Sequence, residues 1–195
     1  MRVVAGELRG RRLSAAAGRE TRPTSERARA GLFDWLGPRV DGARVLDLFA
    51  GTGALGIEAL SRGASDAVFV ERSREALRAL RKNLAELELS GRAHVVERDL
   101  ARGLGSCVLE SERFDLVFAD PPYEGHWLEK LVACESLAER LAPDAVVIAE
   151  RSQRTDPERD TPLLRLRGTK RYGETAFDWY ERAPAVAAGE GRVES

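Results

Sequence analysis

Residues 47–60 read DLFAGTGALGIEAL, and an apolar run, ARVL at 43–46, comes directly before them. Within this stretch Gly51, Gly53 and Gly56 match the pattern G-x-G-x-x-G, whose small residues allow a tight turn from a strand into a helix and a close approach to a ligand. Glu71 follows Gly51 by 20 residues, at the end of the next apolar run. The stretch therefore predicts a nucleotide-like ligand held on a loop between a strand and a helix.

On both sides of this loop, strand-like runs alternate with segments of helical periodicity. Strands are expected at 43–50, 66–71, 93–99, 114–120 and 144–150, and helices at 25–36, 53–63, 73–88, about 100–109 and 125–140. Because parallel strands are joined by crossover helices, this order predicts an α/β fold with a parallel sheet that is covered on both faces. Two more β-like runs within 162–182 have no helix between them, so an antiparallel pair should complete a mostly parallel seven-stranded sheet.

Size and composition are those of one soluble globular domain. The chain has 195 residues, of which 43% are hydrophobic and 32% charged, and it contains no apolar run as long as the roughly 20 residues of a membrane span. The N-terminus lacks the apolar core of a secretory signal. Cys107 and Cys134 form no C-x-x-C pair, so we expect reduced thiols in a cytoplasmic protein, with no metal site and no disulfide.

Positive charge is concentrated near the N-terminus, although the net charge of the whole chain is only −1. Residues 1–30 contain eight arginines against three glutamates, and residues 165–171, RLRGTKR, add four bases without an acid. Each cluster has two interpretations, a solvated face or a surface that holds the phosphates of a nucleic acid.

Asp47 distinguishes between the ligands that such a loop can bind. It lies four residues before Gly51, beside the loop, where a carboxylate would repel the roughly two negative charges of a dinucleotide's pyrophosphate. S-adenosylmethionine (SAM) has no phosphate and carries a sulfonium and an ammonium group, both of which favour a neighbouring acid. The sequence thus favours SAM over a nicotinamide dinucleotide.

Two further acids are assigned to the same ligand. Glu71 is expected to accept hydrogen bonds from the ribose hydroxyls, and Asp99, after the third strand, to meet the adenine amine. Asp99 has the alternative of capping the N-terminus of a helix. The predicted cofactor-binding residues are Asp47, Phe49, Ala50, Gly51, Gly53, Glu71, Arg72, Asp99 and Leu100.

The fourth strand-like run ends in D-P-P-Y, residues 120–123, at the same carboxyl edge of a parallel sheet as the glycine loop. An exocyclic amine of a nucleobase is a poor nucleophile, because its lone pair is conjugated with the ring. The Asp120 carboxylate and the Pro121 carbonyl can accept its hydrogens and orient the lone pair, while the Pro121–Pro122 pair holds that carbonyl rigid. Tyr123 offers a face on which an unstacked base can rest. Beside a SAM loop, D-P-P-Y predicts an amino-methyltransferase site.

Four segments of the sequence resemble the RsmD-type methyltransferases. They are GELRGRRL at 6–13, RPTSERARAGLFDWL at 22–36, DLFAGTGALGIEALSRGA at 47–64 and DPPY at 120–123, in the order found in that family. The glycine loop and D-P-P-Y occur in many amino-methyltransferases, whereas the two N-terminal segments narrow the resemblance to this family. It covers about residues 1–182.

The resemblance implies a Rossmann-like class I SAM-dependent methyltransferase that modifies the N2 amine of one guanine in 16S ribosomal RNA, within the assembling small subunit. It implies an N-terminal β-hairpin extension at 1–20 before a methyltransferase domain at 21–182, and RNA contacts by Arg9, Arg11, Arg22, Thr24 and Arg27. Residues 183–195 lack periodicity and are expected to be a disordered tail. We expect a monomer.

Three alternatives stay open at the level of sequence. D-P-P-Y also suits methylation of adenine N6 in DNA or RNA, the literal G-x-G-x-x-G suits an NAD-dependent oxidoreductase, and the arginines alone suit a non-catalytic RNA-binding module. His94, which lies in a strand, and Trp127 and Trp179 are interpreted as structural, and His126 as a candidate for an RNA-facing lip.

Overall fold

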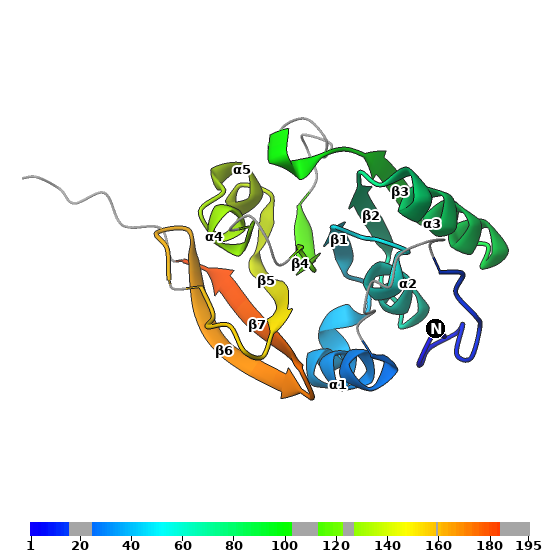
Figure 1. Ribbon diagram of the computed structural model, residues 1–195, viewed down its shortest axis with the longest axis horizontal. Helices are drawn as coiled ribbons and strands as arrows, with labels where there is room; N and C mark the ends of the chain where they lie inside the picture. Colours follow the sequence, from blue (N-terminus) through cyan, green and yellow to red (C-terminus); the bar gives the residue numbers. More distant parts are fainter. Residues whose placement is uncertain (16–24, 103–112, 123–126, 159, 184–195) are drawn as a thin grey trace, which may run out of the picture.

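Seven strands lie side by side in a single sheet, in the order β3-β2-β1-β4-β5-β7-β6 (Figure 1). The computed structural model describes residues 1–15, 25–102, 113–122, 127–158 and 160–183. The strands are β1 Arg44–Leu48, β2 Asp66–Glu71, β3 Ala93–Glu97, β4 Phe114–Ala119, β5 Leu141–Ser152, β6 Leu164–Tyr172 and β7 Thr175–Arg182. β1 to β5 are parallel to one another, and β7 is antiparallel to its neighbours β5 and β6. The predicted mostly parallel α/β sheet is confirmed.

The strand order reverses at β1, which lies between β2 and β4. Leu48, the last residue of β1, is in register with Val70 of β2 and Ala119 of β4. In open α/β sheets, ligands bind outside the carboxyl ends of the strands at such a switch point. The segments that follow β1, β2 and β4 therefore form the expected binding edge.

Helices cover both faces of the sheet (Figure 1). α1 Glu26–Leu36, α2 Ala54–Ser61 and α3 Arg74–Glu86 contribute apolar side chains to one core, and α4 Trp127–Val132 and α5 Glu135–Ala138 to the other. The alternation of side chains along β1 sends Val45 into the first core and Leu46 into the second. The short 3-10 helices η1 Gly37–Val40 and η2 Leu100–Arg102 complete the described helices, none of which is long and apolar enough to span a membrane.

Two of the helices begin where the sequence predicts. The Ser25 and Ser73 hydroxyls accept hydrogen bonds from the backbone N–H groups of Ala28 and Ala76 at 3.1 and 3.4 Å. The single helix expected at 125–140 is divided into α4 and α5, because Cys134 between them is extended, with φ −84° and ψ 104°. Cys134 carries a free thiol, and Cys107 lies outside the described residues.

The N-terminal segment, residues 1–14, folds back on itself and packs against α2. Arg2 and Arg12 form one isolated antiparallel bridge, and no strand is assigned within residues 1–15, so the paired strands of the expected hairpin are not confirmed. Gly6 has φ +83°, and a Cβ atom there would lie 1.8 Å from the carbonyl oxygen of Ser61. Only glycine fits at this contact.

A buried carboxylate fixes the N-terminal segment to α2. Glu58 is 1% exposed and accepts hydrogen bonds from the backbone N–H groups of Val4 at 2.8 Å and Ala5 at 3.0 Å. It also pairs with Nε of Arg29 at 3.3 Å and Nε of Arg62 at 2.9 Å. A buried charge requires such a full set of partners. The segment, α1 and α2 are therefore held together at one point.

Candidate active site

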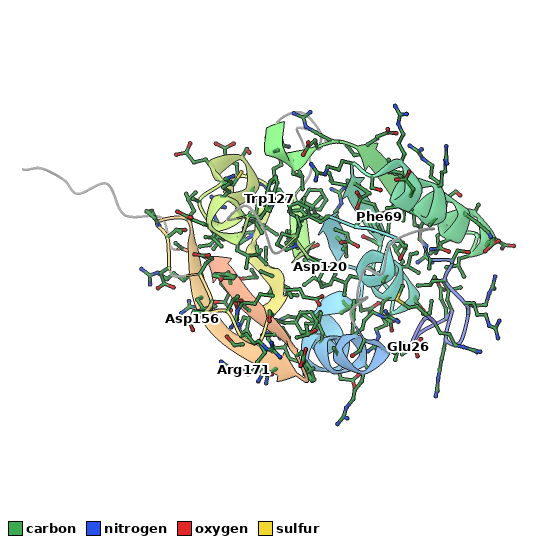
Figure 2. All side chains as sticks on the ribbon, in the orientation of Figure 1. Glu26, Phe69, Asp120, Trp127, Asp156 and Arg171 are labelled. Atoms are coloured by element: carbon green, nitrogen blue, oxygen red, sulfur yellow. The ribbon has the colours of Figure 1, made fainter. Side chains whose placement is uncertain are left out.

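Residues from four neighbouring strand ends meet at the carboxyl edge of the sheet. The glycine loop, residues 49–53, follows β1, Glu71 ends β2, Asp99 comes after β3, and Asp120 follows β4. Figure 2 shows Asp120 near the middle of the molecule, in the central part of the sheet. The predicted cofactor-binding residues and the D-P-P motif thus share one edge.

The glycine loop has an unusual backbone. Phe49, Gly51 and Gly53 have φ values of 61°, 58° and 85°, in the left-handed region that favours glycine. A Cβ atom on Gly53 would lie 2.5 Å from Cδ1 of Leu80, so this glycine allows close packing against α3. Among the described residues, a Cβ atom on Gly51 would meet only the Phe49 carbonyl oxygen, at 3.9 Å. The described part of the chain therefore leaves space on this side of the loop.

Asp47 lies underneath this loop. It is 2% exposed, and its Oδ2 accepts a hydrogen bond from the backbone N–H of Gly56 at 2.9 Å. Burial raises the pKa of Asp47 to about 7. The hydrogen bond from Gly56 lowers this pKa in part, and the negative charges of Asp120 and Glu71 raise it further. A carboxylate in this position favours a cation over an anion, because a nearby positive charge would restore its ordinary pKa.

Glu71 holds the loop from the β2 side. Its Oε2 accepts from the backbone N–H of Gly51 at 2.8 Å, and its Oε1 accepts from the N–H groups of Arg72 and Ser73 at 2.8 and 2.7 Å. The carboxylate thus connects the loop to the start of α3. Each oxygen has further lone pairs, so Glu71 remains able to accept from a ligand hydroxyl.

Asp99 makes the capping contact that the sequence offered as its alternative role, and its contact with the adenine amine stays a prediction. Its Oδ1 accepts from the backbone N–H of Ala101 at 3.0 Å, which caps η2, and its Oδ2 pairs with Arg72 at 3.2 Å. Leu100 and Phe49 are partly buried against the second core. Together these residues form the β2–β3 side of the site.

The D-P-P motif lies across the site from these residues. The side chain of Asp120 reaches solvent, Pro121 is buried and Pro122 is exposed. The protein around Asp120 nevertheless raises its pKa to about 6 through desolvation. Tyr123 and His126, which were assigned to the substrate side, lie outside the described residues.

An aromatic contact joins the two halves of the site. The rings of Phe49 and Trp127 are 5.2 Å apart between centroids and meet edge to face. Trp127 is the first residue of α4, so the helix after D-P-P-Y is packed against the glycine loop. Trp179 packs against Trp35, with centroids 4.6 Å apart. The structural interpretation of both tryptophans agrees with these contacts.

The predicted RNA-contacting residues are only partly described. Arg9, Arg11 and Arg27 are exposed, and Arg22 and Thr24 lie outside the described residues. Arg11 donates to the carbonyl of Glu86 at 2.6 Å. Arg9 and Arg27 make no ion pair within the described part of the chain. His94 is in β3, as expected, but its side chain is exposed.

A hollow of about 360 Å³ lies at the opposite edge of the sheet. It is lined by residues at the amino ends of β1, β4 and β5, among them Ala43, Asp115 and Asp144. None of the predicted site residues lines it. We place the candidate active site at the carboxyl edge instead, because the strained loop and the perturbed carboxylates are there.

Sequence reasoning missed one residue of the site. Asn83 is 1% exposed in α3 and hydrogen-bonds the glycine loop through the carbonyl of Thr52 at 3.0 Å. The available signal was a polar side chain on the apolar stripe that includes Leu80 and Leu84. A buried amide in that position must have partners.

Known proteins are similar to this chain over most of its length. A family model described as "Conserved hypothetical protein 95" matches residues 1–181. A putative rRNA methyltransferase, YlbH, of Bacillus subtilis is 38% identical over 183 residues, which cover 93% of this chain and 99% of the relative. Ribosomal RNA small subunit methyltransferase D of Escherichia coli is 35% identical over 186 residues, 93% of this chain and 90% of the relative.

Solved structures share the fold. A putative methyltransferase, yhhF, from Escherichia coli superposes with a TM-score of 0.77 and 34% identity, covering 94% of this chain and 98% of that one. An RNA methyltransferase from Salinibacter ruber in complex with S-adenosyl-L-homocysteine has a TM-score of 0.63 at 19% identity, covering 84% of this chain and 94% of that one. The second likeness concerns the fold alone.

Proposed function

Since this chain belongs to the RsmD-type family, whose model is described as conserved hypothetical protein 95, we propose that it is a SAM-dependent methyltransferase that modifies a guanine N2 amine in 16S ribosomal RNA. Its relatives are named as a putative rRNA methyltransferase and as small-subunit rRNA methyltransferases. SAM supplies an electrophilic methyl group when it is bound. The residues of the chain bind this cofactor, orient the amine and accept the RNA.

The carboxyl edge of the sheet fits SAM better than a dinucleotide. Asp47, Glu71 and Asp120 bring three carboxylates to the carboxyl edge at the glycine loop, and burial together with the charges of Asp120 and Glu71 raises the pKa of Asp47 to about 7. Gly51 would hold the ligand on its open side, with Asp47 and Glu71 beneath and beside it. A pyrophosphate would add negative charge to this site, which opposes the NAD-dependent alternative.

Asp120 and the carbonyl of Pro121 would orient the target amine. Each accepts one of the two N2 hydrogens, so the lone pair is turned toward the methyl group. With SAM bound, the lone pair would form the new N–C bond as the methyl group's bond to sulfur breaks, and the methylated amine would then give one proton to solvent. The ionised carboxylate is the stronger acceptor, and a pKa of about 6 leaves Asp120 mostly ionised at neutral pH. Tyr123 is proposed to stack on the guanine.

One observation carries this proposal. The register of the sheet puts the ends of β1 and β4 side by side, with Leu48 opposite Ala119, which supports a common reaction space for the proposed cofactor loop and the proposed amine-orienting motif. Neither motif alone defines a methyltransferase. Their juxtaposition, with a carboxylate under the loop, supports methyl transfer to a conjugated amine.

The substrate is proposed to be 16S ribosomal RNA in the assembling small subunit. The exposed Arg9, Arg11 and Arg27 support contact with phosphates, and the family resemblance extends the proposed RNA contact to Arg22 and Thr24. We propose a methyltransferase domain at 21–182 that acts as a monomer, with residues 1–20 as its RNA-binding extension and 183–195 as a tail.

The proposal is tested with purified full-length protein, radiolabelled SAM and three substrates offered separately, namely 16S ribosomal RNA, ribosomal particles and DNA. Digestion of the labelled RNA to nucleosides and mass spectrometry should give N2-methylguanosine. Label in N6-methyladenosine would favour the adenine alternative instead. RNA binding without label in any substrate would support the non-catalytic RNA-binding module.

A further inference from the structure

A buried amide joins the glycine loop to the N-terminal segment. Nδ2 of Asn83 donates to the carbonyl of Thr52 at 3.0 Å and to the carbonyl of Ser14 at 3.2 Å. Oδ1 of the same residue accepts from the backbone N–H of Ser14 at 2.7 Å. Asn83 therefore contacts the two segments at once, from its place in α3.

These bonds leave one orientation for the amide. Oδ1 meets an N–H group, and Nδ2 meets two carbonyl oxygens, so exchanging the two atoms would oppose acceptors to acceptors and a donor to a donor. All three partners are backbone groups. Asn83 is 1% exposed, so water cannot replace a lost hydrogen bond. The loss of any of these bonds would leave a buried polar group unsatisfied.

The glycine loop depends on such external support. Phe49 has a left-handed backbone conformation, which is costly for a residue other than glycine and persists only where the surroundings stabilise it. Glu71 holds Gly51 through its N–H. Asn83 holds the next residue, Thr52, through its carbonyl. Among the hydrogen bonds of the described residues, no other side chain bonds both this loop and the N-terminal segment.

We propose that Asn83 is a positioning residue that couples the SAM loop to the N-terminal segment, so that a cofactor bound at the loop also orders the segment. The inference rests on the proposed function, because it takes SAM as the ligand of the loop. Thermodynamic linkage makes the coupling reciprocal. A partner that holds the segment, such as RNA on Arg9, then tightens cofactor binding by the same factor.

The coupling is measured by hydrogen–deuterium exchange of the full chain, with and without S-adenosylhomocysteine (SAH). In the wild-type protein SAH should slow exchange at residues 49–56 and also at residues 2–14. Asn83→Ala should weaken SAH binding, measured by calorimetry, by roughly 5- to 150-fold. At saturating SAH this variant should retain protection of the loop but lose the response of the segment.

Two further variants separate positioning from general stability. Leu84→Ala removes a neighbouring core side chain that makes no hydrogen bond to the loop, and it should lower the melting temperature without changing the response of the segment. Asn83→Asp keeps an acceptor for the Ser14 N–H but loses the donors to both carbonyls. It should therefore weaken SAH binding, as Asn83→Ala does, while keeping part of the protection of the segment.

The outcomes are distinguishable. If wild-type protein binds SAH and its segment does not respond, or if the segment of Asn83→Ala responds as in the wild type, the coupling is wrong and the proposed function stands. If wild-type protein binds neither SAM nor SAH, the proposed function is wrong and the coupling with it.

Discussion

Asp47 and Asp120 come from adjacent parallel strands, and both have raised pKa values, about 7 for Asp47 and about 6 for Asp120. Desolvation by the surrounding protein is the main cause in each case, and the charge of Asp120 contributes to the shift of Asp47. Such a pair opposes folding in the absence of a counter-charge. Carboxylates with perturbed pKa values at one edge of a sheet are typical of a functional site.

Replacing Asp47 with asparagine should raise the stability of the fold and weaken the binding of SAM. The folded-state pKa of Asp47, about 7, lies above the ordinary value of 3.8. Ionisation of Asp47 therefore lowers the stability of the ligand-free fold progressively as the pH rises from about 4 through 7. At pH 8 Asp47→Asn should melt several degrees above the wild type, with SAM affinity reduced at least about 10-fold. At pH 4 the two melting temperatures should converge. Asp144→Asn, at an exposed position at the other edge, serves as the control.

The Asp120 carboxylate should set the acid limb of the pH–rate profile. Because the ionised carboxylate accepts from the amine more strongly than the protonated form, turnover should fall as pH drops below about 6. Asp120→Asn should reduce kcat at least about 100-fold, leave SAM affinity within a few-fold and remove that limb. Single-turnover methylation of 16S ribosomal RNA across pH 5 to 8 measures this, with the exposed loop variant Asp156→Asn as the control (Figure 2). An unchanged rate would exclude Asp120 from catalysis.

Alanine substitutions at two glycines of the loop should have different effects. Gly53→Ala places a methyl group 2.5 Å from Leu80 and should cost about 1 to 3 kcal/mol of unfolding free energy. Gly51→Ala meets open space, so its cost is the strain of φ 58°, about 1 kcal/mol, and the main effect should be on SAM binding. Urea unfolding and calorimetry of both variants test this. Equal SAM affinity in Gly51→Ala and the wild type would contradict the ligand-facing role of Gly51.

Loss of the Glu58 carboxylate should release the N-terminal segment. Glu58→Ala leaves the buried guanidinium of Arg29 without its ion pair and removes the acceptor of the Val4 and Ala5 N–H groups. We expect a loss of about 3 to 5 kcal/mol in unfolding free energy. Limited proteolysis within residues 1–14 should accelerate. Glu86→Ala, which removes an exposed pair with Lys82, should change stability by less than about 1 kcal/mol.

Local pattern was enough to predict the sheet. Alternation of apolar runs with helical periodicity and the serine caps at Ser25 and Ser73 gave the strands and the helix starts, because each signal is carried by residues close in sequence. The carboxyl edge followed from parallel pairing. The break at Cys134 was not predictable, since the segment on both sides of it has ordinary helical composition.

Long-range contacts between side chains and backbone atoms could not be predicted from the sequence. Glu58 bonds Val4 and Asn83 bonds Ser14, across 54 and 69 residues. Every residue type except proline offers the same backbone N–H and C=O groups. The residue type of the backbone partner therefore does not indicate such a contact. The role of Tyr123 and the choice of guanine stay predictions, the second resting on the family resemblance.

The contacts of Asn83 have an evolutionary consequence. Since the amide binds only main-chain atoms of Thr52 and Ser14, mutations of those two side chains leave its hydrogen bonds intact. Positions 14 and 52 are therefore expected to drift among relatives, whereas position 83 should be under strong purifying selection. We expect a library that randomises positions 14, 52 and 83 and is selected for methylation to recover asparagine at position 83, while positions 14 and 52 stay variable.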